Sequence, residues 1–383
     1  MAQRPTPFGF APPFRLFLVC PPGLETFLAV EAREIGLGDA VVAPGGVEAT
    51  GDWEAVWRAN LQLRGAVRVM VELAQFRALH LAQLDKRLRR LDWSSLLPQR
   101  TAVHVEALCR RSRIYHAGAA AERLGRALAD AVAARHVRTR AEAAFGLRLR
   151  IDDDLCTVSL DSSGDPLYRR GYKEAVAKAP MRETMAALFL RAAGFDGQEP
   201  VLDPMCGSGT FVLEAAGIAA GLQPGQARHF AFEGLRCHDD DRFRALRHAA
   251  APVPSENPRF HGSDRDAGAI AAATGNAARA GLEALTEFKQ RAVSEIAPPE
   301  GSPPGLVIAN PPYGARIGEP GQLAPLYATF GRVLRERFSG WRAAIITSDE
   351  GLARATGLPF RDPGPPVPHG GLRVRLWQTG PLQ

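Results

Sequence analysis

One stretch of the chain combines an acid with a glycine-rich turn, a pattern that could bind a ligand. It reads D-P-M-C-G-S-G-T over residues 203–210, after the apolar pair Val201-Leu202 and before an apolar run over 211–216. Gly207 and Gly209 allow positive φ and a close approach of a ligand to the backbone. A strand, a glycine turn and a helix N-terminus in this order are typical of the ligand-binding corner of a doubly wound sheet.

The same stretch limits the class of ligand. A phosphate loop would carry a lysine after its glycines, and a dinucleotide loop would carry a third glycine where Phe211 and Val212 stand. What remains is Asp203 at the end of the strand, facing the turn. A carboxylate there suits a cationic or hydroxyl-bearing ligand better than a pyrophosphate.

A second stretch, N-P-P-Y-G, follows the short apolar strand expected over 306–309. Consecutive prolines remove backbone donors and hold the chain extended. The carbonyls of Asn310 and Pro311 are therefore free to accept hydrogen bonds from a group outside the sheet, and the ring of Tyr313 can stack on a planar substrate. The predicted catalytic residues are Asn310, Pro311, Pro312 and Tyr313.

The first stretch resembles the first motif of S-adenosylmethionine-dependent methyltransferases. The second resembles the amino-methyltransferase signature, which acts on the nitrogen of a planar amide-like or amidine-like group. The resemblance implies S-adenosyl-L-methionine as the cofactor. The residues that it assigns to cofactor binding in the turn are Asp203, Pro204, Met205, Cys206, Gly207, Ser208, Gly209 and Thr210.

Two further acids are candidates for the cofactor site. In a doubly wound sheet, a carboxylate at the end of the second strand accepts hydrogen bonds from the ribose hydroxyls. Asp264, at the end of the strand expected over 260–264, is placed there, with Asp266 as the alternative; capping of the following helix fits Asp266 better. Glu183 could face the cofactor, or could simply be an acid favoured in the first turn of the helix that it begins.

The elements that must position these residues form an α/β fold. The expected catalytic part is a Rossmann-like seven-stranded domain whose terminal antiparallel strand, over 371–377, joins an otherwise parallel sheet. Before it, residues 14–73 show the β-α-β-β-α-β succession of a ferredoxin-like unit. A basic α/β region follows, which contains a long Ala-rich helix and two strands joined by the acidic turn 152–154.

The region between the ferredoxin-like unit and the catalytic domain is strongly basic. Residues 86–150 hold fifteen Lys/Arg and five Asp/Glu, whereas the whole chain of 383 residues has a net charge of only +6. Such a local excess indicates a polyanion ligand, and arginines beside aromatics such as Tyr115 can contact phosphates and stack on bases. The predicted RNA-binding residues are Arg110, Arg111 and Arg113 and, in an exposed junction, Arg169, Arg170 and Lys173.

The order of these motifs along nearly the whole chain is similar to that of the RlmL-type 23S rRNA guanine-N2 methyltransferases. The motifs that carry the likeness include D-S-S-G-D-P-L-Y-R-R-G-Y from Asp161, A-P-M-R-E-T-M-A-A from Ala179 and G-S-D-R-D from Gly262. The resemblance implies an N-terminal ferredoxin-like part (1–65), a THUMP RNA-binding domain (66–165) and a Rossmann-like methyltransferase domain (166–383). It also implies N2-methylation of a guanosine that is flipped into the N-P-P-Y pocket.

Other functions stay open on the sequence. A tRNA guanine-N2 methyltransferase can share both the THUMP part and N-P-P-Y. A DNA adenine-N6 methyltransferase is further away, because the front half points to RNA. A non-catalytic RNA-binding assembly factor is the alternative from another class.

The sequence departs from the family pattern at one position. Family members usually carry an Asp where Ala292 stands, and that Asp contacts the adenine of the cofactor. Either a backbone group, Gln290 or Glu295 replaces this contact, or the cofactor binds less tightly.

Composition fits a cytoplasmic location. No run of eighteen apolar residues is present, so no membrane span is expected. The cysteines form no C-x-x-C pair, which fits a reducing compartment without disulfides or a zinc site.

The run His238-Asp239-Asp240-Asp241 is interpreted as helix capping rather than a metal site, since the enzyme class that the chain resembles needs no metal. The oligomeric state stays unknown.

Overall fold

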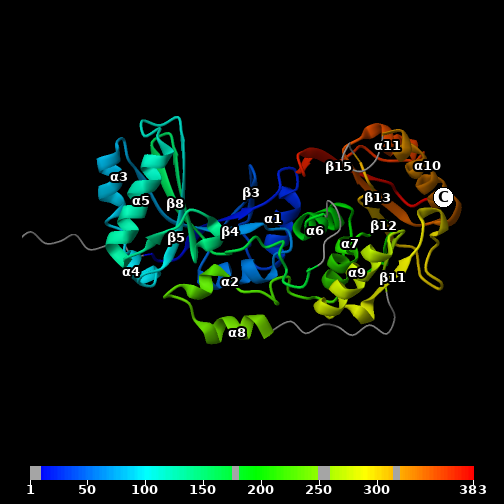
Figure 1. Cartoon of the computed structure of the whole chain (residues 1–383), viewed down its shortest axis with the longest axis horizontal. Coiled ribbons are helices and arrows are strands. Elements are labelled where there is room, and N and C mark those ends of the chain that lie inside the picture. Colours follow the sequence, from blue (N-terminus) through cyan, green and yellow to red (C-terminus); the bar gives the residue numbers. More distant parts are fainter. Residues whose placement is uncertain (1–9, 175–180, 249–258, 314–319) are drawn as a thin grey trace, which may run out of the picture. The chain divides into compact units, whose positions relative to one another are not determined.

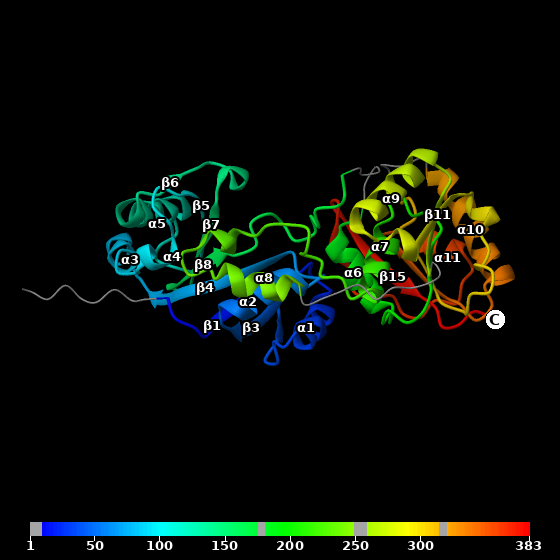
Figure 2. The ribbon, with the colours of Figure 1, turned by 90° about the horizontal axis from the view of Figure 1, so that it is seen from below.

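The computed structural model describes residues 10–174, 181–248, 259–313 and 320–383 (Figure 1, Figure 2). The chain divides into two compact units. The first comprises Met1–Cys20, Ala29–Leu167 and Arg228–Ala249, and the second Pro21–Leu28, Tyr168–Ala227 and Ala250–Gln383. The first unit contains an eight-stranded sheet and the second a seven-stranded sheet.

The front of the chain forms the expected β-α-β-β-α-β succession. Four strands lie in the order β2-β3-β1-β4, and every pair is antiparallel. Asp52 caps α2, because its carboxylate accepts a hydrogen bond from the N–H of Ala55. The elements are β1 (Phe14–Val19), α1 (Glu25–Glu34), β2 (Val41–Ala43), β3 (Gly46–Gly51), α2 (Trp53–Gln62) and β4 (Arg68–Arg77).

The same sheet continues through the basic region. β4 pairs with β1 on one side and with β8 on the other, so one strand serves both parts. β7 and β8 form a hairpin whose turn residues Asp153 and Asp154 have positive φ, and β5 pairs with β7 in parallel. The elements are α3 (Leu81–Leu88), α4 (Trp93–Leu96), β5 (Ala102–Arg110), α5 (Ala117–Val132), β6 (Arg135–His136), β7 (Phe145–Asp152) and β8 (Leu155–Asp161).

The segment Arg228–Ala249 belongs to the first unit, although it lies within the range that the sequence assigns to the methyltransferase domain. The guanidinium of Arg228 donates to the carbonyl oxygens of Ser163, Asp165 and Pro166. Helix α8 (Asp240–His248) follows Asp239, whose carboxylate accepts a hydrogen bond from the N–H of Arg242. The acids of this run therefore act at a helix N-terminus, as the sequence predicts.

The sheet of the second unit has the order β11-β10-β9-β12-β13-β15-β14. Pairing is parallel from β11 to β13, and β15 joins β13 antiparallel, as expected. The short strand β14 was not predicted, because its sequence lies in a Pro/Gly-rich stretch that indicates a loop. The strands are β9 (Val201–Asp203), β10 (Phe260–Asp264), β11 (Thr286–Gln290), β12 (Leu306–Ala309), β13 (Arg342–Thr347), β14 (Val367–His369) and β15 (Leu372–Gln378).

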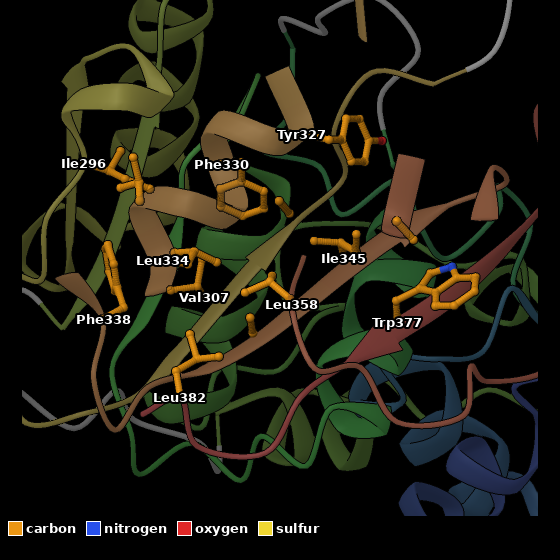
Figure 3. Packing of buried hydrophobic residues seen from close by; sticks show 14 of the residues in the cluster. Ile296, Val307, Tyr327, Phe330, Leu334, Phe338, Ile345, Leu358, Trp377 and Leu382 are labelled. Carbon is orange, nitrogen blue, oxygen red and sulfur yellow. The ribbon is translucent and has the colours of Figure 1, made fainter. Parts of the chain in front are cut away.

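A hydrophobic core joins one face of this sheet to helix α10 (Pro320–Arg337). Phe330 and Leu334 of the helix point towards Val307 of β12 and Ile345 of β13 (Figure 3). These residues are fully buried, and such burial of apolar surface is the main stabilising term of a fold. The remaining helices of the second unit are α6 (Glu183–Ala192), α7 (Thr210–Ala219), α9 (Ala267–Ala280) and α11 (Glu350–Ala355).

Within the described residues, no helix combines the length and the apolar character that crossing a membrane requires.

Candidate functional site

The two chemically informative stretches follow neighbouring parallel strands. Val307 pairs with Leu202, so Asp203 at the end of β9 and Asn310 just after β12 lie at the same carboxyl edge of the sheet. Met205 and Tyr313, one from each stretch, pack against the same hydrophobic core cluster. The glycine turn and the N-P-P-Y segment therefore meet at one edge of the sheet.

The turn 203–210 is held by backbone hydrogen bonds and by glycine conformations. The N–H of Cys206 donates to the carbonyl of Ser263 on β10. Gly207 and Gly209 have φ of 53° and 85°. A Cβ on Gly209 would lie 3.1 Å from both Ala273 and Phe288, so only glycine fits this position without strain. Gly209 then caps α7, which begins at Thr210.

Asp203 is a buried acid beside this turn. Its side chain accepts a hydrogen bond from the N–H of Met205 at 3.0 Å, and the residue is only 2% exposed. Burial, with a smaller contribution from the negative charge of Asp264, raises the pKa of Asp203 to about 8. A buried carboxylate of this kind gains stability when a cationic or hydroxyl-bearing ligand hydrogen-bonds to it.

The structure separates the two acids that follow β10. Asp264 Oδ2 accepts from the N–H of Gly207 at 3.0 Å, so this side chain touches the glycine turn. Asp266 instead caps α9, accepting from the N–H groups of Gly268 and Ala269. Asp264 is therefore the acid placed next to the turn, and Asp266 has the structural role that the sequence favoured for it.

The N-P-P-Y segment leaves an acceptor without a partner. Asn310 Oδ1 is buried and has no hydrogen-bond partner among the described residues. The hydroxyl of Tyr327 donates to the carbonyl of Pro312 at 3.2 Å and so holds the segment against α10. Burial raises the pKa of Tyr313, which keeps its ring neutral. A buried amide oxygen without a partner is costly, so this atom is a candidate acceptor for a ligand donor.

The turn itself also contains an unsatisfied polar atom. Ser208 Oγ is buried and has no hydrogen-bond partner in the described part of the chain, and the same holds for Ser263 Oγ on β10. These two unsatisfied hydroxyls fit a polar ligand seated on the turn. The chemistry of the residues therefore agrees with a cofactor that offers ammonium, carboxylate and hydroxyl groups.

Lys173 is not exposed to solvent, contrary to the sequence prediction. Its Nζ lies 3.0 Å from Glu183 Oε1 and 2.8 Å from the hydroxyl of Thr210, and the side chains of the lysine and the glutamate are 8% and 7% exposed. The lysine therefore contacts Thr210, which is the last residue of the glycine turn and the first of α7. Because the sequence shows a charge but not its partner, the local pattern suggested an RNA contact.

The exposure predicted for Arg170 is also wrong. Its guanidinium forms an ion pair with Glu214 of α7 at 3.1 Å, and both side chains are almost completely buried. The hydroxyl of Tyr172 donates to the same carboxylate. Arg170 therefore anchors the junction to α7 rather than presenting a charge to RNA. Arg169, which directly precedes Arg170, is exposed.

The predicted basic cluster lies at one end of the first unit's sheet. Arg110 ends β5, and Arg110, Arg111 and Arg113 are all exposed. Asp152 pairs with Arg111 at 2.8 Å, and Asp154 accepts from the backbone N–H of Arg113. Tyr115 is 73% exposed, and its ring centroid lies 4.2 Å from that of His116. The cluster thus combines cations with exposed rings, while the acidic turn neutralises part of its charge.

The structure shows the surroundings of Gln290 and Glu295, the two side chains that the sequence proposes for the adenine contact. Ala292 stands between β11 and a short 3₁₀ helix over Val293–Glu295. The side chain of Gln290 donates to the carbonyl of Arg265, and that of Glu295 accepts from the N–H of Ala292. Both side chains thus have partners within the chain.

Two supporting residues were missed by the sequence analysis. Asn276, buried in α9, donates through Nδ2 to the carbonyl of Ser208 and so fixes the turn. Tyr327 of α10 holds the N-P-P-Y segment through its hydrogen bond to Pro312. An asparagine inside an Ala-rich helix is the signal that could have revealed the first. Tyr327 stands among apolar positions of α10 and gives no such signal.

Two regions of the chain match known families. Residues 170–359 match the family described as RMKL-like, methyltransferase domain, and residues 15–70 match the RlmL ferredoxin-like domain. A ribosomal RNA large subunit methyltransferase K/L of Syntrophotalea carbinolica is 36% identical over 90% of this chain and 51% of its own length. The chain thus spans about half the length of such curated relatives.

Similarity also extends over whole proteins of comparable length. A Synechocystis protein provisionally named as an RNA methyltransferase, slr0064, is 31% identical over 92% of this chain and 93% of its own. The crystal structure of SMU.472, provisionally classed as a methyltransferase and solved as a complex with SAH, superposes with a TM-score of 0.83 at 27% identity. That match covers 97% of this chain and 98% of the other.

Proposed function

Because the chain belongs to the RlmL-like methyltransferase family, we propose that it transfers a methyl group from S-adenosyl-L-methionine to the exocyclic N2 of a guanosine in 23S ribosomal RNA. The observation that carries this proposal is the unpartnered Asn310 Oδ1 at the sheet edge that also holds the glycine turn. Relatives named as ribosomal RNA methyltransferases and a neighbour solved with SAH support the substrate class and the cofactor.

The cofactor site is the turn 203–210 with Asp264. Asp264 touches the turn through Gly207 and still has lone pairs for hydroxyl donors. Asp203 supplies a second, buried acidic side chain. The cofactor, when bound, supplies a methyl group on a sulfonium, which is already an excellent leaving group. Catalysis therefore depends mainly on how the acceptor is held.

The acceptor amine is weakly nucleophilic, since its lone pair is delocalised into the guanine ring. Asn310 Oδ1 and the carbonyl of Pro311 can each accept one of its N–H bonds and hold it in line with the methyl carbon. The nitrogen then bonds to the methyl carbon while the carbon–sulfur bond breaks, and the electron pair stays on sulfur. The product nitrogen releases its extra proton to water, so no strong general base is needed.

The base must leave its helix to reach this edge of the sheet. The ring of Tyr313, which is partly buried beside Asn310, can stack on the extruded purine. The basic cluster of the first unit, formed by Arg110, Arg111 and Arg113, would bind the surrounding RNA through its phosphates.

Methylation of defined RNAs tests the reaction and its substrate. The purified protein is incubated with S-adenosyl-L-methionine and either deproteinised 23S rRNA or tRNA, and the nucleosides are identified by mass spectrometry. N2-methylguanosine in 23S rRNA alone is the expected result. The same product in tRNA would favour a tRNA methyltransferase. N6-methyladenosine, or no methylation of rRNA isolated from a strain that lacks the protein, would overturn the proposal.

Asn310→Ala tests the assigned chemistry. We expect methyl transfer to fall at least about a hundredfold, as is usual when a positioned transition-state acceptor or donor is removed. Binding of SAH, measured by calorimetry, should stay within about twofold of the wild type, since direct cofactor contacts are unchanged. Wild-type turnover by a folded Asn310→Ala protein would contradict the role of this side chain. Loss of SAH binding would place Asn310 in the cofactor site instead.

A further inference from the structure

The contacts of Lys173 place a buried ion pair at the start of helix α7. Lys173 Nζ bonds to Glu183 Oε1 and to the hydroxyl of Thr210, which is the first residue of α7. Both charged side chains are at least nine-tenths buried. Two buried charges are costly to desolvate, and a pair of this kind is weak evidence for a purely stabilising role.

The pair retains capacity for further hydrogen bonds. An ammonium has three N–H donors, and among the described residues the structure gives Lys173 two acceptors. A carboxylate offers about four lone-pair sites, and Lys173 occupies one of those on Glu183. The hydroxyl of Ser208, within the turn, and that of Thr184, next to Glu183 in sequence, are buried and have no partner in the described part of the chain.

The electrostatic surroundings favour a ligand that carries both charges. The first turn of α7 has free backbone N–H groups and the positive end of the helix dipole, which adds to the charge of Lys173. Glu183 supplies the opposite charge 3.0 Å away. An α-amino acid group carries a carboxylate and an ammonium on one carbon, so its charges complement this pair.

We propose that Lys173 and Glu183 together recognise the amino-acid end of the cofactor, with the lysine binding its carboxylate and the glutamate its ammonium. This inference rests on the proposed function. It makes Lys173 a cofactor-binding residue, whereas the sequence predicted that Lys173 binds RNA. The nucleoside end would be bound independently by Asp264. Arg170 and Tyr172 anchor the same segment to Glu214 and have no part in this recognition.

Two ligands distinguish recognition of the amino-acid end from a general structural role. SAH carries the amino-acid group, whereas 5′-methylthioadenosine has the same nucleoside and sulfur but lacks that group. Calorimetry with both ligands is performed on the wild type, Lys173→Met, Lys173→Arg and Glu183→Gln. Tyr172→Phe is the matched control, because it alters the same segment and leaves the ammonium in place.

Lys173→Met should weaken SAH binding by about tenfold to a hundredfold, the effect of losing a hydrogen bond to a charged group. Binding of 5′-methylthioadenosine should change by less than about twofold, and Lys173→Arg should recover part of the SAH affinity. Glu183→Gln should also weaken SAH selectively, and Tyr172→Phe should leave the ratio of the two affinities unchanged.

Other outcomes would overturn this inference. Equal losses for both ligands in Lys173→Met would show that the lysine only maintains the turn, and unchanged SAH binding would show that it plays no part. If Lys173→Met does not fold, the same comparison is made with Lys173→Arg and Glu183→Gln. Wild-type protein that binds neither ligand would instead refute the proposed function.

Discussion

The N–H of Gly207 donates a 3.0 Å hydrogen bond to Asp264 Oδ2, so the carboxylate that ends β10 holds the glycine turn that follows β9. The other oxygen of Asp264 accepts from the N–H of Asp266. One side chain thus holds both the turn that follows β9 and the backbone that follows β10. The neighbouring Asp266 is occupied by helix capping.

Substitution at these two acids should have different effects. Asp264→Ala removes a charged acceptor, and we expect SAH affinity to fall by about tenfold or more. Asp266→Ala should lower the free energy of unfolding by about 1 kcal/mol, the usual cost of losing an N-cap, and should leave SAH affinity nearly unchanged. Calorimetry and urea unfolding measure both quantities. A selective loss of SAH binding in Asp266→Ala would reverse the assignment.

Gly209→Ala should damage the turn. The residue has φ of 85°, and an added Cβ would lie 3.1 Å from Ala273 and Phe288. We expect a loss of about 1–3 kcal/mol in the free energy of unfolding, from backbone strain and crowding, together with weaker SAH binding. Urea unfolding and calorimetry measure these two effects.

Gly125→Ala is the matched control for that substitution. Gly125 lies inside α5, and a Cβ there would meet nothing within 4 Å. Since alanine favours a helix interior over glycine, this variant should be more stable by about 0.5–1 kcal/mol. If both alanine variants were equally destabilised, the special conformation of Gly209 would not be the cause.

The burial of Asp203 predicts a pH-dependent stability. Its pKa is about 8 in the folded protein, against an ordinary value of 3.8. The folded state therefore favours the protonated side chain, and the corresponding stability is lost as the pH rises from about 4 through 8. Asp203→Asn removes this titration. Urea unfolding of the ligand-free proteins should show the variant gaining on the wild type as the pH rises from 5 to 8; a constant difference would contradict the raised pKa.

The basic cluster should determine how RNA affinity depends on salt. Arg113→Ala removes an exposed cation but keeps the backbone hydrogen bond to Asp154. If this arginine contacts a phosphate, affinity for rRNA should fall, and the slope of log affinity against log salt should decrease by about 0.7–1. Lys173→Met should leave that slope unchanged, because the lysine is buried. Filter binding between low and physiological salt measures the slope, and an unchanged slope for Arg113→Ala would exclude the contact.

Local patterns were sufficient for most elements and for the position of the glycine turn. Alternation and helical spacing predicted the ferredoxin-like succession, and Asp52 was correctly identified as a helix cap. Strand β14 was missed because its short sequence pairs only with β15, a contact that the Pro/Gly content around it conceals. Only the three-dimensional contacts show that Asp264, and not Asp266, touches the glycine turn. The sequence alone already favoured helix capping by Asp266.

The errors at Arg170 and Lys173 have a common physical cause. Both residues lie in a short polar segment, where charged side chains are ordinarily exposed. Their partners, Glu214 and Glu183, are on helices that begin further along the chain, and only folding brings the opposite charges together. A pattern confined to neighbouring residues therefore cannot distinguish a buried ion pair from a surface that binds RNA.

Strand β4 links the ferredoxin-like part of the first unit's sheet to the part formed by the basic region. It supplies hydrogen bonds to β1 along one edge and to β8 along the other. A gene fragment ending before it would leave an unpaired edge on the ferredoxin-like side, and one beginning after it would expose β8, both of which invite aggregation. Neither part of this sheet can therefore be separated from the other without exposing a strand edge.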